Sequence, residues 1–288
     1  MKQHTDDQPP SKTVLAAQAL SVGYSERLVI PELSLEIAIG TITALVGPNG
    51  SGKSTVLKTL ARLIAPSAGA VYLDGRAIAS LPTREVARQL AILPQAPTAP
   101  EELTVGELVE QGRYPHAGPL RMLREQDHHA ITEALTQANM LELRDRRLDS
   151  LSGGERQRAW IALALAQSTP ILLLDEPTTF LDVGHQLEIL TLIQQLNRIQ
   201  GKTIVLVLHD LNQAARFAGR IIVLHAGRVV ADGLPRVILT PELLAEVFQV
   251  KATIINHPVD GVPVCLPYAT EANSPDDNQS VSDGSNSS

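Results

Sequence analysis

The chain has 288 residues, of which 44% are hydrophobic, and this is enough to bury one large core without a disulfide or another cross-link. The net charge of −7 argues against broad affinity for nucleic acid, which needs a basic surface, and the single cysteine, Cys265, excludes an internal disulfide. The sequence contains no run of about 18 apolar residues that would predict a membrane-spanning helix. Residues Met1–Lys12 lack an apolar stretch of signal-peptide length, so we expect a cytosolic protein.

The first predicted element is a short strand over Leu15–Leu20, which is followed by Tyr24. An aromatic ring stacks on a flat base with little selectivity, so Tyr24 is a candidate for contact with a nucleobase. The alternative is an ordinary aromatic residue in a turn.

A predicted strand over Thr41–Val46, a glycine-rich segment and a predicted helix over Val56–Ile64 come next, in that order. Glycines permit left-handed turns and leave successive N–H groups free to point at phosphate oxygens. In this setting we expect Lys53 to reach the β- and γ-phosphates and the Ser54 hydroxyl to ligate Mg²⁺. The alternative, a glycine-rich turn without a ligand, does not account for the strand, loop and helix. The predicted nucleotide-binding residues here are Gly47, Pro48, Asn49, Gly50, Ser51, Gly52, Lys53, Ser54 and Thr55.

Gln95 ends the run Leu90-Ala-Ile-Leu-Pro94 and offers an amide to Mg²⁺ or to an attacking water, although a plain polar loop residue is the alternative. A proline-rich, extended stretch follows, and the pattern then changes to helices alone, over Val105–Gln111 and Glu125–Met140. This change predicts an inserted helical lobe.

Ser152-Gly-Gly-Glu155 matches a capping box, and the amphipathic run Arg156–Ala166 after it predicts a helix. A simple cap is the plainer interpretation, but two glycines at a helix start cost stability and leave N–H groups bare. Because Lys53 already marks one phosphate cradle, a second anion site is best explained by the ATP of a second chain. The predicted binding residues are Ser152, Gly153, Gly154 and Glu155.

Ile171-Leu-Leu-Leu-Asp175-Glu176 is typical of a buried parallel strand that ends in two carboxylates, at the edge where open α/β sheets bind ligands. Asp175 is suited to hold Mg²⁺, and Glu176 to orient and deprotonate the water that attacks the γ-phosphate. Taken alone, the pair would be a solvated strand end or a helix cap. A second apolar run, over Lys202–Leu208, ends in His209, which we expect to contact the γ-phosphate, although a lone histidine at a strand end is more often structural.

Ile221–Ala231 predicts a hairpin that turns at Ala226-Gly227, and short strands are expected to continue to Pro267. Residues from Glu271 onward carry acidic and small polar side chains with no basic residue, and this composition predicts disorder.

Taken together, these motifs resemble the nucleotide-binding subunit of an ABC transporter, and the resemblance covers about Val14 to Tyr268. It implies an α/β fold of the P-loop NTPase (ABC ATPase) type, with an N-terminal antiparallel β region and an inserted helical subdomain at about 96–168. Residues 13–268 would form the ATP-binding domain, between disordered segments at 1–12 and 269–288.

By the same resemblance, Leu151–Gln157 corresponds to the signature motif and His209 to the switch histidine, and Thr179–Asp182 resembles the D-loop with Thr in place of the commoner Ser. The family hydrolyses Mg-ATP. We therefore expect Glu176, His209, Lys53 and Gln95 to act in catalysis, and Ser54, Gln95 and Asp175 to hold the metal.

The implied partners are a second copy of the chain, integral permease subunits and, indirectly, a substrate-binding protein, at the cytoplasmic face of the inner membrane. Gly112–His116, Asp182–Gln186 and His209–Ala214 resemble the subgroup that imports ferric siderophores, haem and cobalamin, and a ferric siderophore is our first choice. A soluble ABC ATPase of DNA repair or translation remains an alternative, but it would need long coiled coils or two cassettes. A P-loop kinase or GTPase would share only the first motif. We expect no nucleic-acid partner.

Overall fold

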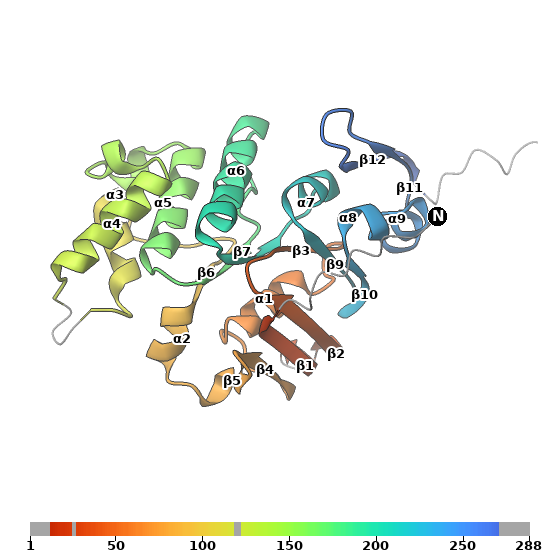
Figure 1. Ribbon diagram of the computed structural model, residues 1–288, viewed down its shortest axis with the longest axis horizontal. Helices are drawn as coiled ribbons and strands as arrows, with labels where there is room; N and C mark the ends of the chain where they lie inside the picture. Colours follow the sequence, from red (N-terminus) through yellow and green to blue (C-terminus); the bar gives the residue numbers. More distant parts are fainter. Residues whose placement is uncertain (1–11, 25–26, 118–121, 271–288) are drawn as a thin grey trace, which may run out of the picture.

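The computed structural model describes residues 12–24, 27–117 and 122–270. At its centre is a six-stranded sheet in the order β10-β9-β3-β8-β7-β6, in which all neighbours pair in parallel except β10 and β9 (Figure 1). Its strands are β3 (Ile42–Val46), β6 (Leu90–Leu93), β7 (Ile171–Asp175), β8 (Thr203–Val207), β9 (Arg220–His225) and β10 (Arg228–Gly233). The predicted apolar runs form these strands because both faces of the sheet are covered.

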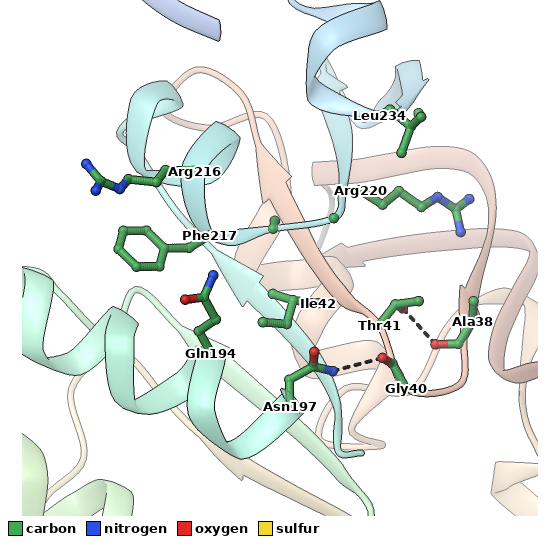
Figure 2. A pocket seen from close by; sticks show the side chains of 13 residues that line it. Ala38, Gly40, Thr41, Ile42, Gln194, Asn197, Arg216, Phe217, Arg220 and Leu234 are labelled. Carbon is green, nitrogen blue, oxygen red and sulfur yellow. Dashed lines mark hydrogen bonds between the residues drawn. The ribbon is translucent and has the colours of Figure 1, made fainter. Parts of the chain in front are cut away.

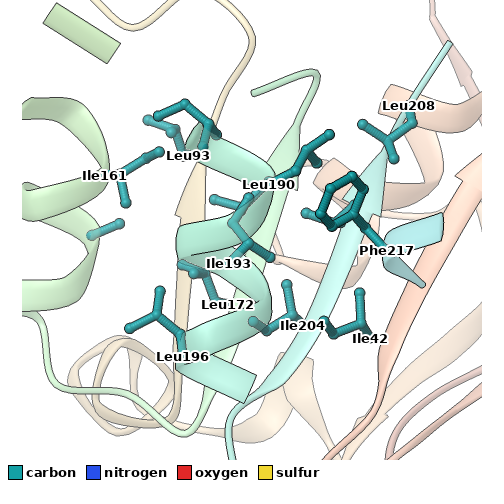
Figure 3. Close-up of a cluster of buried hydrophobic side chains, with 14 of the residues drawn as sticks. Ile42, Leu93, Ile161, Leu172, Leu190, Ile193, Leu196, Ile204, Leu208 and Phe217 are labelled. Atoms are coloured by element: carbon teal, nitrogen blue, oxygen red, sulfur yellow. The ribbon is translucent and has the colours of Figure 1, made fainter. Parts of the chain in front are cut away.

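Side chains of this sheet alternate between two cores. In β8, Ile204 and Leu206 face the core that contains helices α5, α6 and α7, whereas Val205 and Val207 face the core that contains α1. Figure 3 shows the first of these cores, with side chains of α6 packed over β7 and β8. The alternation fixes which face each residue at a strand end meets, and this places the functional side chains described below.

A second, antiparallel sheet covers α1 (Lys53–Leu60) from the other side, so the helix lies between the two sheets (Figure 1). Its order is β2-β1-β4-β5, with β1 (Thr13–Tyr24), β2 (Arg27–Ala38), β4 (Ala68–Leu73) and β5 (Arg76–Ala77). The predicted strand Leu15–Leu20 was too short. The register of β1 shifts between Ala17 and Leu20, and Ala19 has φ 47°, so a bulge interrupts the alternation before the strand continues to Tyr24.

Three helices, α3, α4 and α5, pack on one another at one side of the sheet, at the left of Figure 1. They fall within the predicted helical subdomain, whose boundaries remain a prediction. Besides α1, the α-helices described before the C-terminal part are α2 (Thr83–Gln89), α3 (Val105–Glu110), α4 (Glu125–Gln137), α5 (Gly153–Ala166), α6 (Val183–Gln200) and α7 (Leu211–Phe217). Short 3₁₀ turns lie at Ile78–Ser80, Gln111–Arg113, Leu141–Leu143 and Leu148–Ser150.

Two predicted helices had the wrong bounds. The helix predicted over Val56–Ile64 begins at Lys53 and ends at Leu60, because Arg62 is left-handed (φ 61°). The helix predicted to reach Met140 ends at Gln137, and Asn139 is left-handed (φ 54°) just beyond it. Asparagine tolerates this conformation better than most residues, so it suits a helix end.

The C-terminal part contains helices where the sequence predicted only short strands. The hairpin of β9 and β10 turns at Ala226-Gly227 as predicted. Two helices then follow, α8 (Pro235–Ile238) and α9 (Pro241–Phe248), before the paired strands β11 (Val250–Asn256) and β12 (Pro263–Thr270). The overlooked signal was a proline at the first position of each helix, preceded in α9 by the N-cap Thr240.

The predicted end of the domain at 268 was two residues early, because β12 continues to Thr270. Lys12, expected to be disordered, accepts a backbone hydrogen bond from Ile39. The other predicted disordered residues, 1–11 and 271–288, lie outside the described residues. Among the helices of the described ranges, none combines the length and apolar character needed to cross a bilayer.

Candidate nucleotide-binding and catalytic site

The glycine-rich loop joins the end of β3 to the start of α1. Lys53 is the first residue of α1 and is 5% exposed, and its Nζ donates to the carbonyl oxygens of Gly47 (2.8 Å) and Pro48 (3.0 Å). Burial lowers the pKa of Lys53, against the attraction of two nearby carboxylates, Glu176 and Asp175. The loop therefore curls around the lysine and keeps a cation at its centre.

Two glycines of this loop have positive φ angles that other residues rarely adopt, and at Gly47 the neighbouring backbone also leaves no room for a side chain. Gly47 has φ 150°, and a Cβ there would lie 2.0 Å from the carbonyl oxygen of Leu224. Gly52 has φ 100°, and its Cβ would lie 2.5 Å from Ile30 Cδ1. At Gly50, by contrast, a Cβ would meet nothing within 4 Å, so this part of the loop is open to a ligand.

Asp175 ends β7 on the face of the sheet that α1 covers. Its Oδ1 accepts a hydrogen bond from Ser54 Oγ (2.8 Å), whereas its Oδ2 is buried without a hydrogen-bond partner among the described residues. Lys58 Nζ lies 4.0 Å from Oδ2, which is too far for a hydrogen bond. Burial raises the pKa of Asp175 despite the bond from Ser54. A buried carboxylate with one free oxygen beside a serine hydroxyl fits a small divalent cation such as Mg²⁺.

Glu176 joins two of the other predicted residues. Its Oε1 lies 2.5 Å from His209 Nε2, and its Oε2 accepts hydrogen bonds from Gln95 Nε2 (2.6 Å) and Thr179 Oγ1 (3.0 Å). Glu176 has a left-handed backbone (φ 52°), which turns the chain out of β7 at this residue. Gln95, which was predicted to offer its amide to Mg²⁺ or to the attacking water, donates to Glu176 in this structure, and its role toward the metal remains a prediction.

A cavity of about 180 Å³ lies where the loop and these carboxylates meet. A larger hollow of about 680 Å³ lies near the starts of β3 and β9, the opposite end of the parallel strands (Figure 2). Several of its polar groups are already paired, since Asn197 donates to Gly40 O and Arg220 binds Asp232. The smaller cavity is the better nucleotide site, because it contains the phosphate loop. Its lining residues are Val29, Asn49, Gly50, Gly52, Lys53, Ser54, Thr55, Glu176 and His209.

Tyr24 ends β1 and is half exposed (49%). Its hydroxyl lies 3.5 Å from Thr55 Oγ1, at the limit of a hydrogen bond, and Thr55 lines the 180 Å³ cavity. The ring is thus tethered next to the loop that is predicted to hold the phosphates.

Ser152–Glu155 begins α5 as predicted. Ser152 Oγ accepts from the Glu155 backbone N–H (3.3 Å), and the Ser152 N–H donates to Glu155 Oε2 (2.8 Å). Ser152 and Gly153 are exposed, but Gly154 is buried, and a Cβ there would lie 2.4 Å from the His185 ring. The second glycine therefore serves packing on α6. No residue of this segment is among those that line the 180 Å³ cavity.

Comparisons with known proteins identify the family. Residues 30–179 match the family model described as "ABC transporter". The chain is 50% identical to the iron(3+)-hydroxamate import ATP-binding protein FhuC of Bacillus subtilis over 88% of this chain and 94% of that protein. It is 46% identical to the ferric enterobactin transport ATP-binding protein FepC of Escherichia coli, over 90% and 95%. A solved dimeric ABC transporter cassette is 32% identical, with a TM-score of 0.69 over 77% of this chain and 99% of that one.

This chain belongs to the ATP-binding subunits of ABC transporters. The predicted fold class and the predicted activity, ATP hydrolysis, are confirmed. The role of each individual residue remains a prediction, supported by the contacts described above.

In this ABC subunit, sequence reasoning missed two residues of the site. Thr179, noted only as a departure from the usual D-loop, donates to Glu176, and a hydroxyl three residues after a carboxylate was the available signal. His185 packs on Gly154, and its Nδ1 lies 2.9 Å from Asp182 Oδ1, so it joins the start of α6 to the start of α5. Nothing local in the sequence indicates that contact.

The segment Gly112–His116, which suggested the importer subgroup, holds the helices of the ABC subunit together. Arg113 is buried and binds Asp127 of α4 at 2.9 Å, and it also donates to the carbonyl of Ala166, which ends α5. A Cβ on Gly112 would lie 2.3 Å from Leu163 O. These contacts position α3, α4 and α5 relative to one another.

Proposed function

We propose that this chain is the ATP-hydrolysing subunit of an importer of ferric siderophores. In this proposal two copies bind two Mg-ATP between them and act on a separate permease at the cytoplasmic face of the inner membrane. The cargo is inferred from the two import proteins compared above, which the chain matches over nearly their full length. Haem or cobalamin is the alternative cargo within the same role, and a soluble ABC ATPase is the alternative of another class.

The arrangement around Glu176 is the observation that carries this proposal. A carboxylate that is held by Gln95, Thr179 and His209, is 9% exposed and lines the 180 Å³ cavity suits a general base for an attacking water. When bound, ATP would lie on the Gly47–Thr55 loop with its phosphates near Lys53. Mg²⁺ would be held by Ser54 and Asp175, whose Oδ2 is free, and would neutralise phosphate charge.

Ser152–Glu155 supports the dimer part of the proposal. The capping box uses the N–H groups of Ser152 and Glu155, and this leaves the backbone N–H of the exposed Gly153 for an anion. The segment does not line the cavity of its own chain. In a head-to-tail pair this segment would cover the nucleotide bound to the partner. The related ABC transporter cassette compared above is dimeric, and this supports a pair of chains here.

Uptake of labelled ferric siderophore, haem and cobalamin in cells that lack this chain would test the cargo. Loss of siderophore uptake alone, restored by the chain but not by its Glu176→Gln variant, is the expected result. Unchanged uptake of all three compounds would contradict the transport role. A membrane permease that copurifies with the chain and stimulates its ATPase activity would separate a transporter subunit from a soluble ABC ATPase.

A further inference from the structure

Two loops bring the proposed catalytic side chains together from adjacent strands. Glu176 follows β7, and His209 leaves the end of β8, so their contact joins two segments that are far apart in sequence. His209 is largely open to solvent, with a side chain that is 45% exposed. A single contact to an exposed histidine does not by itself fix two loops relative to each other, because exposed pairs contribute little.

A second connection between these loops runs through two glutamines. Gln213 of α7 donates from Nε2 to Gln186 Oε1 of α6 (2.7 Å), and Gln186 Nε2 donates to the carbonyl oxygen of Leu181 (2.9 Å). Leu181 lies in the loop that carries Glu176, whereas Gln213 lies one helical turn after His209. Helices α6 and α7 are neighbours in the fold (Figure 1).

Each glutamine is tied closely to the loop before it. Asp210, next to His209, caps α7 by accepting from the N–H groups of Asn212 (2.7 Å) and Gln213 (3.0 Å). Gln186 lies in the first turn of α6, where its N–H bonds to Asp182 O. Each end of the Gln186–Gln213 bond is therefore attached to a loop that carries one of the two proposed catalytic residues.

The far side of α7 is held as well. The Asn212 side chain accepts from the Cys265 N–H (2.7 Å) and donates to the Cys265 carbonyl oxygen (3.2 Å), so it ties α7 to β12. The Gln186–Gln213 bond fixes the same helix from the side that faces Glu176. A polar cavity of about 200 Å³ lies between these groups, lined by Glu176 and His209 as well as by both glutamines.

We propose that Gln186 and Gln213 are positioning residues for ATP hydrolysis. Their side-chain hydrogen bond sets the distance between the loop of His209 and the loop of Glu176, and through it the alignment of the attacking water. This inference rests on the proposed roles of Glu176 and His209. Neither glutamine touches the nucleotide cavity, so the bond acts on turnover and not on ATP affinity.

The test replaces each glutamine with methionine, which keeps the length of the side chain but removes the bond. We expect Gln213→Met and Gln186→Met each to lower kcat about 10-fold, since small misalignments of reacting groups are costly. KM for ATP and Tm should stay at wild-type values. Both variants remove the Gln186–Gln213 bond, and Gln186→Met also removes the bond to Leu181 O, so the double variant should lose no more than Gln186→Met alone. Gln194→Met is the matched control, since Gln194 is an exposed glutamine of the same helix and lies two turns beyond Gln186, away from both loops.

Purified full-length chain is assayed alongside Glu176→Gln. If Glu176→Gln abolishes turnover while both methionine variants keep the wild-type kcat, the positioning role is wrong. Additive losses in the double variant, or losses that follow a lowered Tm, would also overturn it. Should one variant fail to fold, the other breaks the same bond and still decides the question. Normal turnover of Glu176→Gln would instead contradict the proposed function itself.

Discussion

The phosphate loop and the start of α5 differ in how much of their surroundings this chain supplies. Around the loop, Lys53 and Asp175 are buried, and Ser54 donates a hydrogen bond to Asp175. All of these groups, and Glu176 next to Asp175, belong to one polypeptide. At the start of α5, Ser152 and Gly153 are exposed, and the contacts of Ser152 do not extend beyond its capping box with Glu155 and the first turn of its own helix. A chain that completes one half of a reaction centre and exposes the other half is suited to share its site with a second copy.

The two regions should therefore respond differently to mutation. Substitutions around the phosphate loop should impair the ATP site of the chain that carries them. Substitutions at the start of α5 should impair the ATP site of the partner chain.

The largest expected effect is at Glu176. Glu176→Gln keeps the size of the side chain and its contacts with neighbours but cannot take a proton from water, so we expect kcat to fall by roughly 10²–10⁴-fold. ATP binding should persist, and the ATP-bound variant should remain as a dimer on gel filtration. Glu188→Gln is a suitable control, because Glu188 is an exposed carboxylate of α6 that pairs with Arg158 of α5. Near-normal turnover of Glu176→Gln would refute the general-base role.

The next effect tests the exposed segment. Ser152→Arg should lower the rate of ATP hydrolysis by about 10²-fold, because hydrogen-bond donors at the start of α5 would no longer be aligned with the phosphate of the partner's ATP. ATP should still bind at Lys53. Thr104→Arg is a matched control, because Thr104 caps α3 through the same kind of capping box with Glu107. Both substitutions remove a cap and add a charge. Equal losses in the two variants would mean that Ser152 is only a helix cap.

Mixing of defective chains distinguishes a shared site from two separate ones. A Lys53→Ala chain and a Ser152→Arg chain are each expected to be inactive alone. In a mixed dimer, one site contains both substitutions and the other contains neither, so hydrolysis should reappear on mixing. If the mixture does not hydrolyse ATP although differently tagged chains show that heterodimers have formed, a site built from both copies would be contradicted.

A smaller effect is expected at Tyr24. Tyr24→Ala should weaken ATP binding by about 1–3 kcal/mol, the usual contribution of stacking on a base. Tyr24→Phe should bind ATP as the wild type does, because the hydroxyl only reaches Thr55 at 3.5 Å. GTP binding should fall in parallel in Tyr24→Ala, since stacking is not selective between bases. Equal ATP affinities of Tyr24→Ala and wild type, measured by calorimetry, would exclude the stacking role.

The sequence predicted those parts of the site that depend on consecutive residues along the chain. An apolar run followed by Asp175 and Glu176, and glycines followed by Lys53, specify strand ends and a loop without knowledge of the fold. It did not predict α8 and α9, whose short apolar segments are compatible with strand or helix. It also gave no sign of the Gln186–Gln213 bond, because that contact depends on how two helices pack.

Within the signature segment, the two glycines Gly153 and Gly154 differ in how closely they are packed. A methyl group on Gly154 would lie 2.4 Å from the His185 ring, so in Gly154→Ala either this ring or one of the two helices, α5 or α6, must shift, and we expect a cost of about 1–3 kcal/mol of stability. At about 2–4 °C per kcal/mol, its Tm should fall by several degrees. Gly153→Ala meets only Leu181 Cδ2 at 3.8 Å, so its Tm should be unchanged or higher. Any loss of hydrolysis in Gly153→Ala must then arise at the exposed face, whereas equal Tm losses in both variants would mean that Gly153 is also a packing residue.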